Sequence, residues 1–153
     1  MAYVKKWGEG ERVGMDDVAE PRGWRIQVDP KNTGAAHLSM GTQEIPPGGR
    51  IPVHLHEVEE EILFFHEGEG EVEIDGALLE VGPGMSVFLP SGIPHGVHNS
   101  GKVPIKMLWI FSSGSILMRL MIAWPLLVLD PSGSSQTLSE KTLPLLVKTK
   151  SAS

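Results

Sequence analysis

The apolar residues between positions 37 and 111 occur in short runs of about four to eight residues, separated by turn-forming residues. Gly and Pro cluster at 46–49, 82–84 and 90–94, and Asn-Ser-Gly follows at 99–101. Runs of this length match β-strands, whereas so many Gly and Pro residues would interrupt a helix. The pattern predicts an all-β fold, a single antiparallel β-barrel or sandwich.

One turn in this region is specified more closely than the others. Asp75-Gly76 lies between two runs with strand character, at 71–74 and 77–81. An Asp-Gly pair favours the two-residue type I′ turn that joins antiparallel strands. We therefore expect a β-hairpin centred on Asp75 and Gly76.

The two ends of the chain differ from this central part. Residues 1–36 are polar and predict an N-terminal arm that packs on the barrel or on a partner, with the alternation at 24–28 as an edge strand. Residues 37–111 are the predicted barrel core. Residues 112–153 contain an apolar segment followed by a polar tail.

The apolar segment is a run at 116–129, broken only by Arg119 and Pro125. A bilayer-spanning helix needs about 20 apolar residues, and Pro125 would kink a helix here. We interpret the run as a buried strand or a contact between subunits.

Composition and charge exclude several classes of function. The chain of 153 residues has the size of one domain and a formal net charge of −6, without a basic cluster, so nucleic acid is not an expected partner. It has no cysteine, which excludes disulfides and thiolate chemistry. Residues 1–13 lack an apolar core segment, so we expect a cytoplasmic protein without a secretory signal or membrane association.

Three histidines and one glutamate are the candidate metal ligands. His54 and His56 are two residues apart and would share one face of a strand. Glu61 begins a run with the character of a buried strand, where an unpaired carboxylate would cost several kcal/mol. The alternative is that Glu61 belongs to an acidic turn with Glu59 and its neighbours. His95 follows the turn at 90–94. Taken singly, a histidine is more often a surface or core residue than a ligand.

Together these residues resemble the two sequence motifs of the cupin superfamily, over about residues 37–111. The motifs read Gly48-x5-His54-x-His56-x4-Glu61-x6-Gly68 and Gly84-x5-Pro90-x-Gly92-x2-His95-x3-Asn99. The resemblance implies a cupin β-barrel (jelly roll, or double-stranded β-helix) that binds one divalent metal ion per chain on His54, His56, Glu61 and His95. It also implies that the motif glycines and Pro90 shape turns, and that the Asn99 side chain closes the last turn.

Three imidazoles and a carboxylate form a mixed nitrogen and oxygen shell that suits Fe(II), Mn(II), Ni(II) or Zn(II) and leaves positions open for water or substrate. We favour Fe(II) or Mn(II), with Zn(II) or Ni(II) as alternatives.

Candidate substrate contacts follow from strand parity. Arg50 shares parity with His54 and would meet an anionic substrate, although a surface arginine is the alternative. Phe65 shares parity with Glu61, and Met107 and Trp109 lie on a strand that must place large side chains inward. An apolar wall of this kind favours an aromatic or otherwise unsaturated small substrate, but core packing explains the same residues equally well.

The remaining histidines are expected outside the site. His98 has the opposite parity to His95, His66 has the opposite parity to Glu61, and His37 has no nearby partner in the sequence.

Three functions are compatible with these residues. We favour the first, a metal-dependent enzyme that catalyses a dioxygenase-type oxidation of a small oxygen-rich or unsaturated substrate. The second is a non-redox isomerase, cyclase or lyase with the ion as a Lewis acid and Glu61 as a ligand and proton shuttle. The third is a non-catalytic small-molecule binder or sensor. The apolar tail and strand-like arm also predict a homodimer, and the alternative is that the tail folds back on its own barrel.

Overall fold

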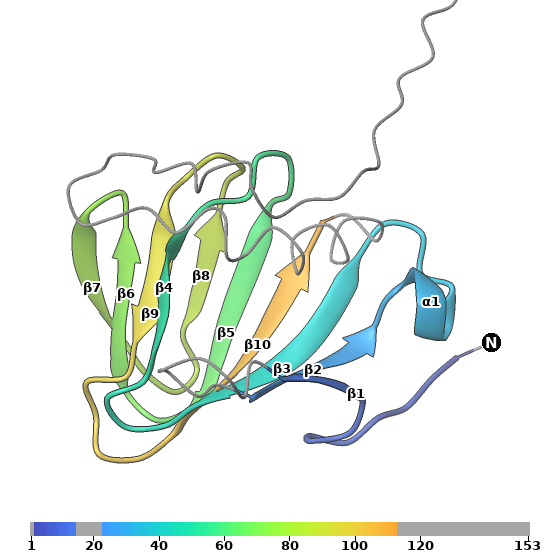
Figure 1. The fold of residues 1–153 in the computed structure, drawn as a ribbon, viewed down its shortest axis with the longest axis horizontal. Coiled ribbons are helices and arrows are strands. Elements are labelled where there is room, and N and C mark those ends of the chain that lie inside the picture. Colours follow the sequence, from blue (N-terminus) through green and yellow to red (C-terminus); the bar gives the residue numbers. More distant parts are fainter. Residues whose placement is uncertain (1, 15–22, 113–153) are drawn as a thin grey trace, which may run out of the picture.

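The computed structural model describes residues 2–14 and 23–112, and in this part of the chain ten β-strands and one four-residue helix are present (Figure 1). In chain order the elements are β1 (Glu11–Gly14), β2 (Gly23–Val28), α1 (Pro30–Thr33), β3 (Ser39–Ile45), β4 (Arg50–His54), β5 (Glu61–Glu67), β6 (Gly70–Ile74), β7 (Ala77–Val81), β8 (Ser86–Leu89), β9 (His95–His98) and β10 (Ile105–Phe111).

The strands form two antiparallel sheets. The larger sheet has the order β1-β2-β3-β10-β5-β8 and the smaller has the order β4-β9-β6-β7. From β3 onward the chain crosses repeatedly between the two sheets, so neighbours within a sheet are far apart in sequence, as in the pairing of β3 with β10. The predicted all-β, antiparallel jelly-roll architecture is confirmed.

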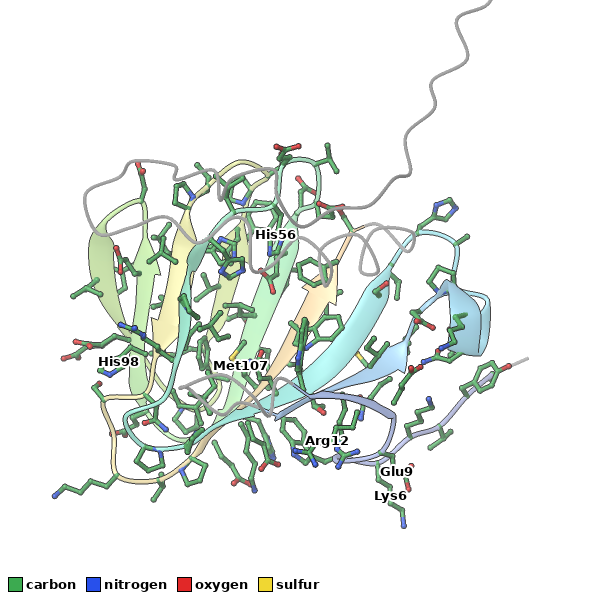
Figure 2. The ribbon with its side chains drawn as sticks, in the orientation of Figure 1. Lys6, Glu9, Arg12, His56, His98 and Met107 are labelled. Atoms are coloured by element: carbon green, nitrogen blue, oxygen red, sulfur yellow. The ribbon has the colours of Figure 1, made fainter. Side chains whose placement is uncertain are left out.

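The core lies between the two sheets and follows the two-residue period of the strands. In β10, Met107, Trp109 and Phe111 are buried and the residues between them are partly exposed. Met107 points into the interior, whereas His98 lies on the outside of the smaller sheet (Figure 2). The inward faces of both sheets carry aliphatic and aromatic side chains whose burial stabilises the barrel.

The predicted hairpin is confirmed. β6 and β7 pair antiparallel, with Ile74 opposite Ala77. Asp75 and Gly76 have φ values of 49° and 80°, and a type I′ turn requires positive φ at both central positions.

The N-terminal segment extends the larger sheet. The edge strand predicted at 24–28 is present as β2, but it is not an edge, because β1 pairs along its outer side. That prediction was wrong in this respect, since β1 is too short and polar to be recognised from its sequence. Before β1, Trp7 Nε1 donates a hydrogen bond to Glu44 Oε1 at 3.0 Å, and its ring lies 5.5 Å from that of His66. These contacts fix the segment to the outer face of the sheet.

The apolar run at 116–129 and the rest of the tail lie outside the described residues, so their role stays a prediction, as does the homodimer. Within the described ranges, the structure contains no helix long and apolar enough to cross a membrane.

Candidate metal centre

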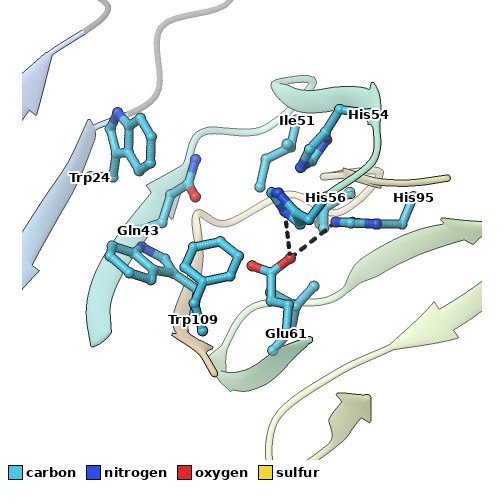
Figure 3. Close-up of a pocket in the computed structure, with 11 residues that line it drawn as sticks. Trp24, Gln43, Ile51, His54, His56, Glu61, His95 and Trp109 are labelled. Atoms are coloured by element: carbon cyan, nitrogen blue, oxygen red, sulfur yellow. Dashed lines mark hydrogen bonds and ion pairs between the residues drawn. The ribbon is translucent and has the colours of Figure 1, made fainter. Parts of the chain in front are cut away.

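The four candidate ligands meet where β4, β5 and β9 come together. His54 is the last residue of β4 and lies opposite His95, the first residue of β9. Glu61 is the first residue of β5 and lies opposite Phe111 on β10. His56 lies in the loop after β4 rather than in the strand, and it still points to the same centre (Figure 3).

The side chains are close enough to share one ion. One ligand atom from each residue lies within 4.8 Å of the others. The ring centroids of the three histidines are 4.4 to 5.1 Å apart, and all four residues are buried, with at most 7% of their surface exposed.

Backbone carbonyls fix the orientation of two of the imidazoles. His54 Nδ1 donates to Pro52 O at 2.8 Å, and His95 Nδ1 donates to Ile93 O at 2.8 Å. Because a carbonyl oxygen only accepts, each ring carries its proton on Nδ1 and, when neutral, has a lone pair on Nε2. This is the tautomer that binds a metal through Nε2.

The contact between His95 and Glu61 then needs a positive charge. His95 Nε2 lies 3.0 Å from Glu61 Oε2, and His56 Nε2 lies 3.2 Å from the same oxygen. A lone pair of neutral His95 would face a carboxylate lone pair and repel it. Either a second proton on the imidazole or a cation between the atoms relieves this repulsion.

The electrostatics of the cluster keep Glu61 anionic and His54 neutral. Burial, followed by the neighbouring His95 and His56, lowers the pKa of His54 from 6.5 to about 3, so this imidazole is neutral at physiological pH. Burial raises the pKa of Glu61, but hydrogen bonds from His56 and His95 outweigh this effect and lower it to about 2. The cluster therefore offers an anionic carboxylate and at least one neutral imidazole at pH 7.

The donor set fits a divalent metal ion in both chemistry and spacing. Adjacent ligands on an octahedral ion with bonds of about 2.1 Å lie about 3.0 Å apart, and the two contacts with Glu61 Oε2 are 3.0 and 3.2 Å. In addition, the buried Nδ1 of His56 has no hydrogen-bond partner among the residues that the structure describes. His54, His56, Glu61 and His95 are the residues that would hold the ion.

A family model described as a cupin domain matches residues 41–111. The match contains all four residues of the cluster. Residues 41–111 are a cupin domain.

Curated relatives match about half of the chain or somewhat more. An uncharacterized protein of Methanocaldococcus jannaschii is 34% identical over 70 residues, which are 46% of this chain and 56% of that protein. Polyketide synthase CurC of Streptomyces cyaneus is 30% identical over 88 residues, 58% of this chain and 57% of that protein. Quercetin 2,3-dioxygenase of Bacillus subtilis is 31% identical over 93 residues, 61% of this chain and 26% of that protein. The matches thus span little more than half the length of the first two relatives.

Solved structures confirm the cupin double-stranded β-helix. A predicted oxalate decarboxylase from Thermotoga maritima aligns with a TM-score of 0.65 and 20% identity, covering 72% of this chain and 99% of that one. The polyketide cyclase RemF from Streptomyces resistomycificus aligns with a TM-score of 0.61 and 26% identity, covering 72% and 79%.

The cluster forms one side of a pocket inside the cupin domain. Outside the cluster the lining residues are apolar or aromatic, with one amide: Trp24, Gln43, Ile51, Leu63, Val97, Trp109 and Phe111. Among residues 2–14 and 23–112, no lysine or arginine lines the pocket. Trp24 and Trp109 meet edge to face at 6.1 Å, Trp109 and Phe111 are 5.3 Å apart, and Phe111 lies 4.8 Å from the His56 ring. We call Trp24, Trp109 and Phe111 the aromatic wall.

The four residues predicted to contact substrate do not all line the pocket. Trp109 lines the pocket. Phe65 and Met107 are fully buried but lie outside its lining. Arg50 is exposed and also outside the lining, because an irregularity in β4 between Ile51 and His54 breaks the parity on which its placement depended.

Several pocket residues escaped the sequence analysis, notably Trp24, Gln43 and Phe111. Gln43 shares parity with the buried Ile45, which is the signal that could have placed it inside.

The residues expected outside the cluster behave as predicted. His37, His66 and His98 are exposed. Asn99 is fully buried and closes its turn, donating through Nδ2 to Ile45 O and Val103 O and accepting from Gly101 N.

Proposed function

We propose that the cupin domain is a metal-dependent enzyme that acts on a small, oxygen-bearing aromatic or polyketide-like substrate without oxidising it, as an isomerase, cyclase or lyase does. The observation that carries this proposal is the pairing of a buried three-histidine, one-glutamate donor set with an aromatic wall in one pocket. When bound, a divalent ion supplies a Lewis acid that polarises a chelated carbonyl oxygen.

The net charge of the metal-loaded site favours a substrate that binds as an enolate or a phenolate. Three neutral imidazoles and one carboxylate around a divalent ion leave a net charge of about +1 in apolar surroundings. One anionic oxygen of the substrate neutralises this charge, and none of the described residues that line the pocket is a second cation. The site therefore favours the form of a carbonyl compound that has lost one proton.

The aromatic wall orients the substrate and excludes water. Phe111 lies against His56, so a ring that packs on Phe111 is held next to the ligand cluster. Trp109 continues the same surface away from the cluster. A planar substrate stacks on the aromatic wall and buries its ring against it, whereas a free sugar has no flat apolar ring to stack.

Glu61 serves as an anionic ligand in this proposal rather than as the proton acceptor. Its pKa of about 2 makes it a weak base. Its Oε2 faces both His56 and His95, and its second oxygen points to the side where Trp109 lies (Figure 3).

The relatives support this class of substrate. Two of the proteins that the chain resembles are a polyketide cyclase and a polyketide synthase protein. Dioxygenase-type oxidation with Fe(II) or Mn(II) is the second candidate, favoured by the donor set and by the similarity to quercetin 2,3-dioxygenase over part of that protein's length.

The test starts with metal content, measured by plasma mass spectrometry on protein purified without chelator or nickel. We expect about one divalent ion per chain, lost in a His54→Ala/His56→Ala double variant. Absence of metal from the unaltered protein would overturn the proposal.

Turnover then separates the candidates. With benzoylacetone in D2O and no oxygen, the metal-loaded protein should accelerate exchange of the C2 proton, measured by NMR, while the double variant should not. Oxygen uptake without anaerobic exchange would favour the dioxygenase, and binding with neither activity would indicate a sensor or carrier.

A further inference from the structure

We propose that Glu59 is a positioning residue for His56, and that its carboxylate accepts the Nδ1 proton which this imidazole must carry when its Nε2 binds a metal ion. Glu59 is not among the residues that line the pocket, so it acts through His56 and not on a substrate. The inference rests on the metal site of the proposed function and adds a residue that supports this site.

Glu59 is buried in a loop whose other acidic residues are exposed. Between β4 and β5, Glu57 and Glu60 are exposed and Val58 is 65% exposed, whereas Glu59 is only 4% exposed. The loop thus turns a carboxylate inward and an apolar side chain outward, which is the reverse of the usual preference. Burial of a carboxylate is costly unless it is paired, so the position of Glu59 calls for a partner.

Two buried side-chain atoms of this loop lack a hydrogen-bond partner. They are Oε1 of Glu59 and Nδ1 of His56, and neither has a partner within the part of the chain that the structure describes. Three residues of chain span at most about 11 Å, and here the chain also bends at Glu57 and Val58. Both atoms therefore belong to one short, bent segment beside the ligand cluster.

Backbone hydrogen bonds hold the loop on both sides of Glu59. The carbonyl oxygen of His56 accepts from Gly92 N at 2.7 Å. Glu60 N donates to Ser112 Oγ, and Glu60 O accepts from Ser112 N, each at 3.1 Å. Because the backbone is fixed before and after it, the inward direction of the Glu59 side chain is set by the fold.

His56 differs from the other two histidines of the cluster. His54 and His95 each donate their Nδ1 proton to a backbone carbonyl two residues earlier in the chain. The His56 ring instead packs against Phe111 at 4.8 Å. Metal-binding histidines almost always donate their other ring N–H to an acceptor, which is often a carboxylate. Glu59 is the buried acceptor that His56 would use.

The position of the proton accounts for the missing contact between the two atoms. His56 Nε2 lies 3.2 Å from Glu61 Oε2, and a hydrogen bond between them needs the proton on Nε2. Nδ1 then carries a lone pair, which forms no hydrogen bond with the Glu59 carboxylate. Metal binding through Nε2 reverses the tautomer. One proton leaves Nε2 and one is taken up at Nδ1, so the imidazole stays neutral and Nδ1–H can donate to Glu59 Oε1.

Zinc affinity of the full chain, measured by competition with a chelating dye, is the first test. Glu59→Leu removes the acceptor and should weaken zinc binding about tenfold to a hundredfold, the range found for such partners of metal ligands. Glu59→Gln keeps an acceptor oxygen and should recover part of the affinity. The matched control is Glu60→Leu, which removes the same charge from an exposed position of the loop and should cause a much smaller loss. Equal affinities for Glu59→Leu and Glu60→Leu would overturn the inference.

The second test reads the tautomer directly, from long-range proton–nitrogen NMR spectra of the imidazoles. We expect the His56 proton on Nε2 in the presence of chelator and on Nδ1 in the zinc-loaded chain. The Nδ1 proton resonance should move upfield in zinc-loaded Glu59→Leu, because its hydrogen bond to a carboxylate is lost, and should stay in place in Glu60→Leu. An unmoved Nδ1 resonance in Glu59→Leu would overturn the role of Glu59.

Urea unfolding with chelator separates this role from a purely structural one. The urea midpoint of Glu59→Leu should not fall, since Oε1 makes no hydrogen bond with the described residues that the variant could lose. A lower midpoint would assign Glu59 to the structure of the loop and overturn the inference. If Glu59→Leu does not fold, the same measurements on Glu59→Gln decide, with Glu60→Gln as their control. Failure of the unaltered chain to bind zinc would overturn the proposed function itself, whereas zinc binding without these effects would overturn only the role of Glu59.

Discussion

Gly41 on β3 lies directly opposite Trp109 on β10, and a Cβ atom at position 41 would clash with Cζ2 of the indole. The Trp109 ring therefore occupies the space that a side chain at position 41 would need. Trp109 is the middle member of the aromatic wall, so the absence of a side chain at Gly41 sets the shape of the pocket.

Gly41→Ala is expected to displace Trp109. The added methyl group also meets Arg25 O at 2.2 Å, and overpacking of this kind costs about 1–3 kcal/mol. Urea unfolding should show this loss, and the near-ultraviolet circular dichroism of the tryptophans should change. The control is Gly23→Ala, since a Cβ there meets nothing within 4 Å. Equal unfolding free energies for the two variants would contradict the prediction.

Glu61→Gln should weaken both metal binding and the stability of the metal-free protein. The substitution removes the only anionic donor, so metal affinity should fall at least about tenfold, as measured by competition with a chelating dye. Without metal, the substitution removes the carboxylate whose hydrogen bonds with His56 and His95 lower its pKa, so the unfolding free energy at pH 7 should also fall. The exposed Glu60→Gln is the control and should change neither quantity.

The stability of the metal-free protein should fall with decreasing pH below 6.5. The pKa of His54 falls from 6.5 to about 3 on folding, so between these values the unfolded chain binds a proton that the folded chain does not. Within this window, the unfolding free energy falls by about 1.4 kcal/mol for each unit by which the pH decreases. The pKa of Glu61 falls from 4.5 to about 2 on folding, so below pH 4.5 this residue causes a further decrease in the unfolding free energy.

A His54→Asn variant isolates the contribution of His54. Its unfolding free energy, measured in urea with chelator, should depend less on pH between 6.5 and 4.5 than that of the unaltered protein. The exposed His37→Asn serves as the control and should keep the full slope. Parallel slopes for all three proteins would remove His54 as the cause.

The predicted homodimer can be tested on β8, an edge strand of the larger sheet. Phe88 on this strand is 57% exposed and lies beside Ile62, which is 41% exposed. If these side chains lie in the contact, Phe88→Glu should shift the sedimentation coefficient from dimer to monomer. Leu78→Glu, an equally exposed apolar position on the smaller sheet, should leave the dimer intact. A monomer in the unaltered protein would contradict the prediction.

The ligand cluster could be predicted from sequence because its spacing is local. His54, His56 and Glu61 lie within eight residues of one another, and His95 belongs to a second motif of fixed spacing. The turn at Asp75-Gly76 is local in the same way.

The pocket wall could not be predicted in full, because parity gives the face of a strand but not the depth along it. Phe65 and Met107 have the correct inward parity and still lie outside the pocket lining. Gln43 meets Trp24 and Met107 only through the register of β2, β3 and β10, and β10 is far from the other two strands in sequence. The prediction for Arg50 failed for another reason, because an irregularity in β4 breaks the parity between Arg50 and His54.

Two of the four ligands are anchored by hydrogen bonds within three residues of chain, His54 to Pro52 O and His95 to Ile93 O. Their imidazoles are therefore oriented before any ion arrives, and little rearrangement accompanies loading. A mixed nitrogen and oxygen shell binds several divalent ions in the general order of affinity for such metals, and metal availability then decides which of them is bound. The ion recovered with the protein will depend on the metals supplied during growth, so the expression medium becomes a variable to control in every activity measurement.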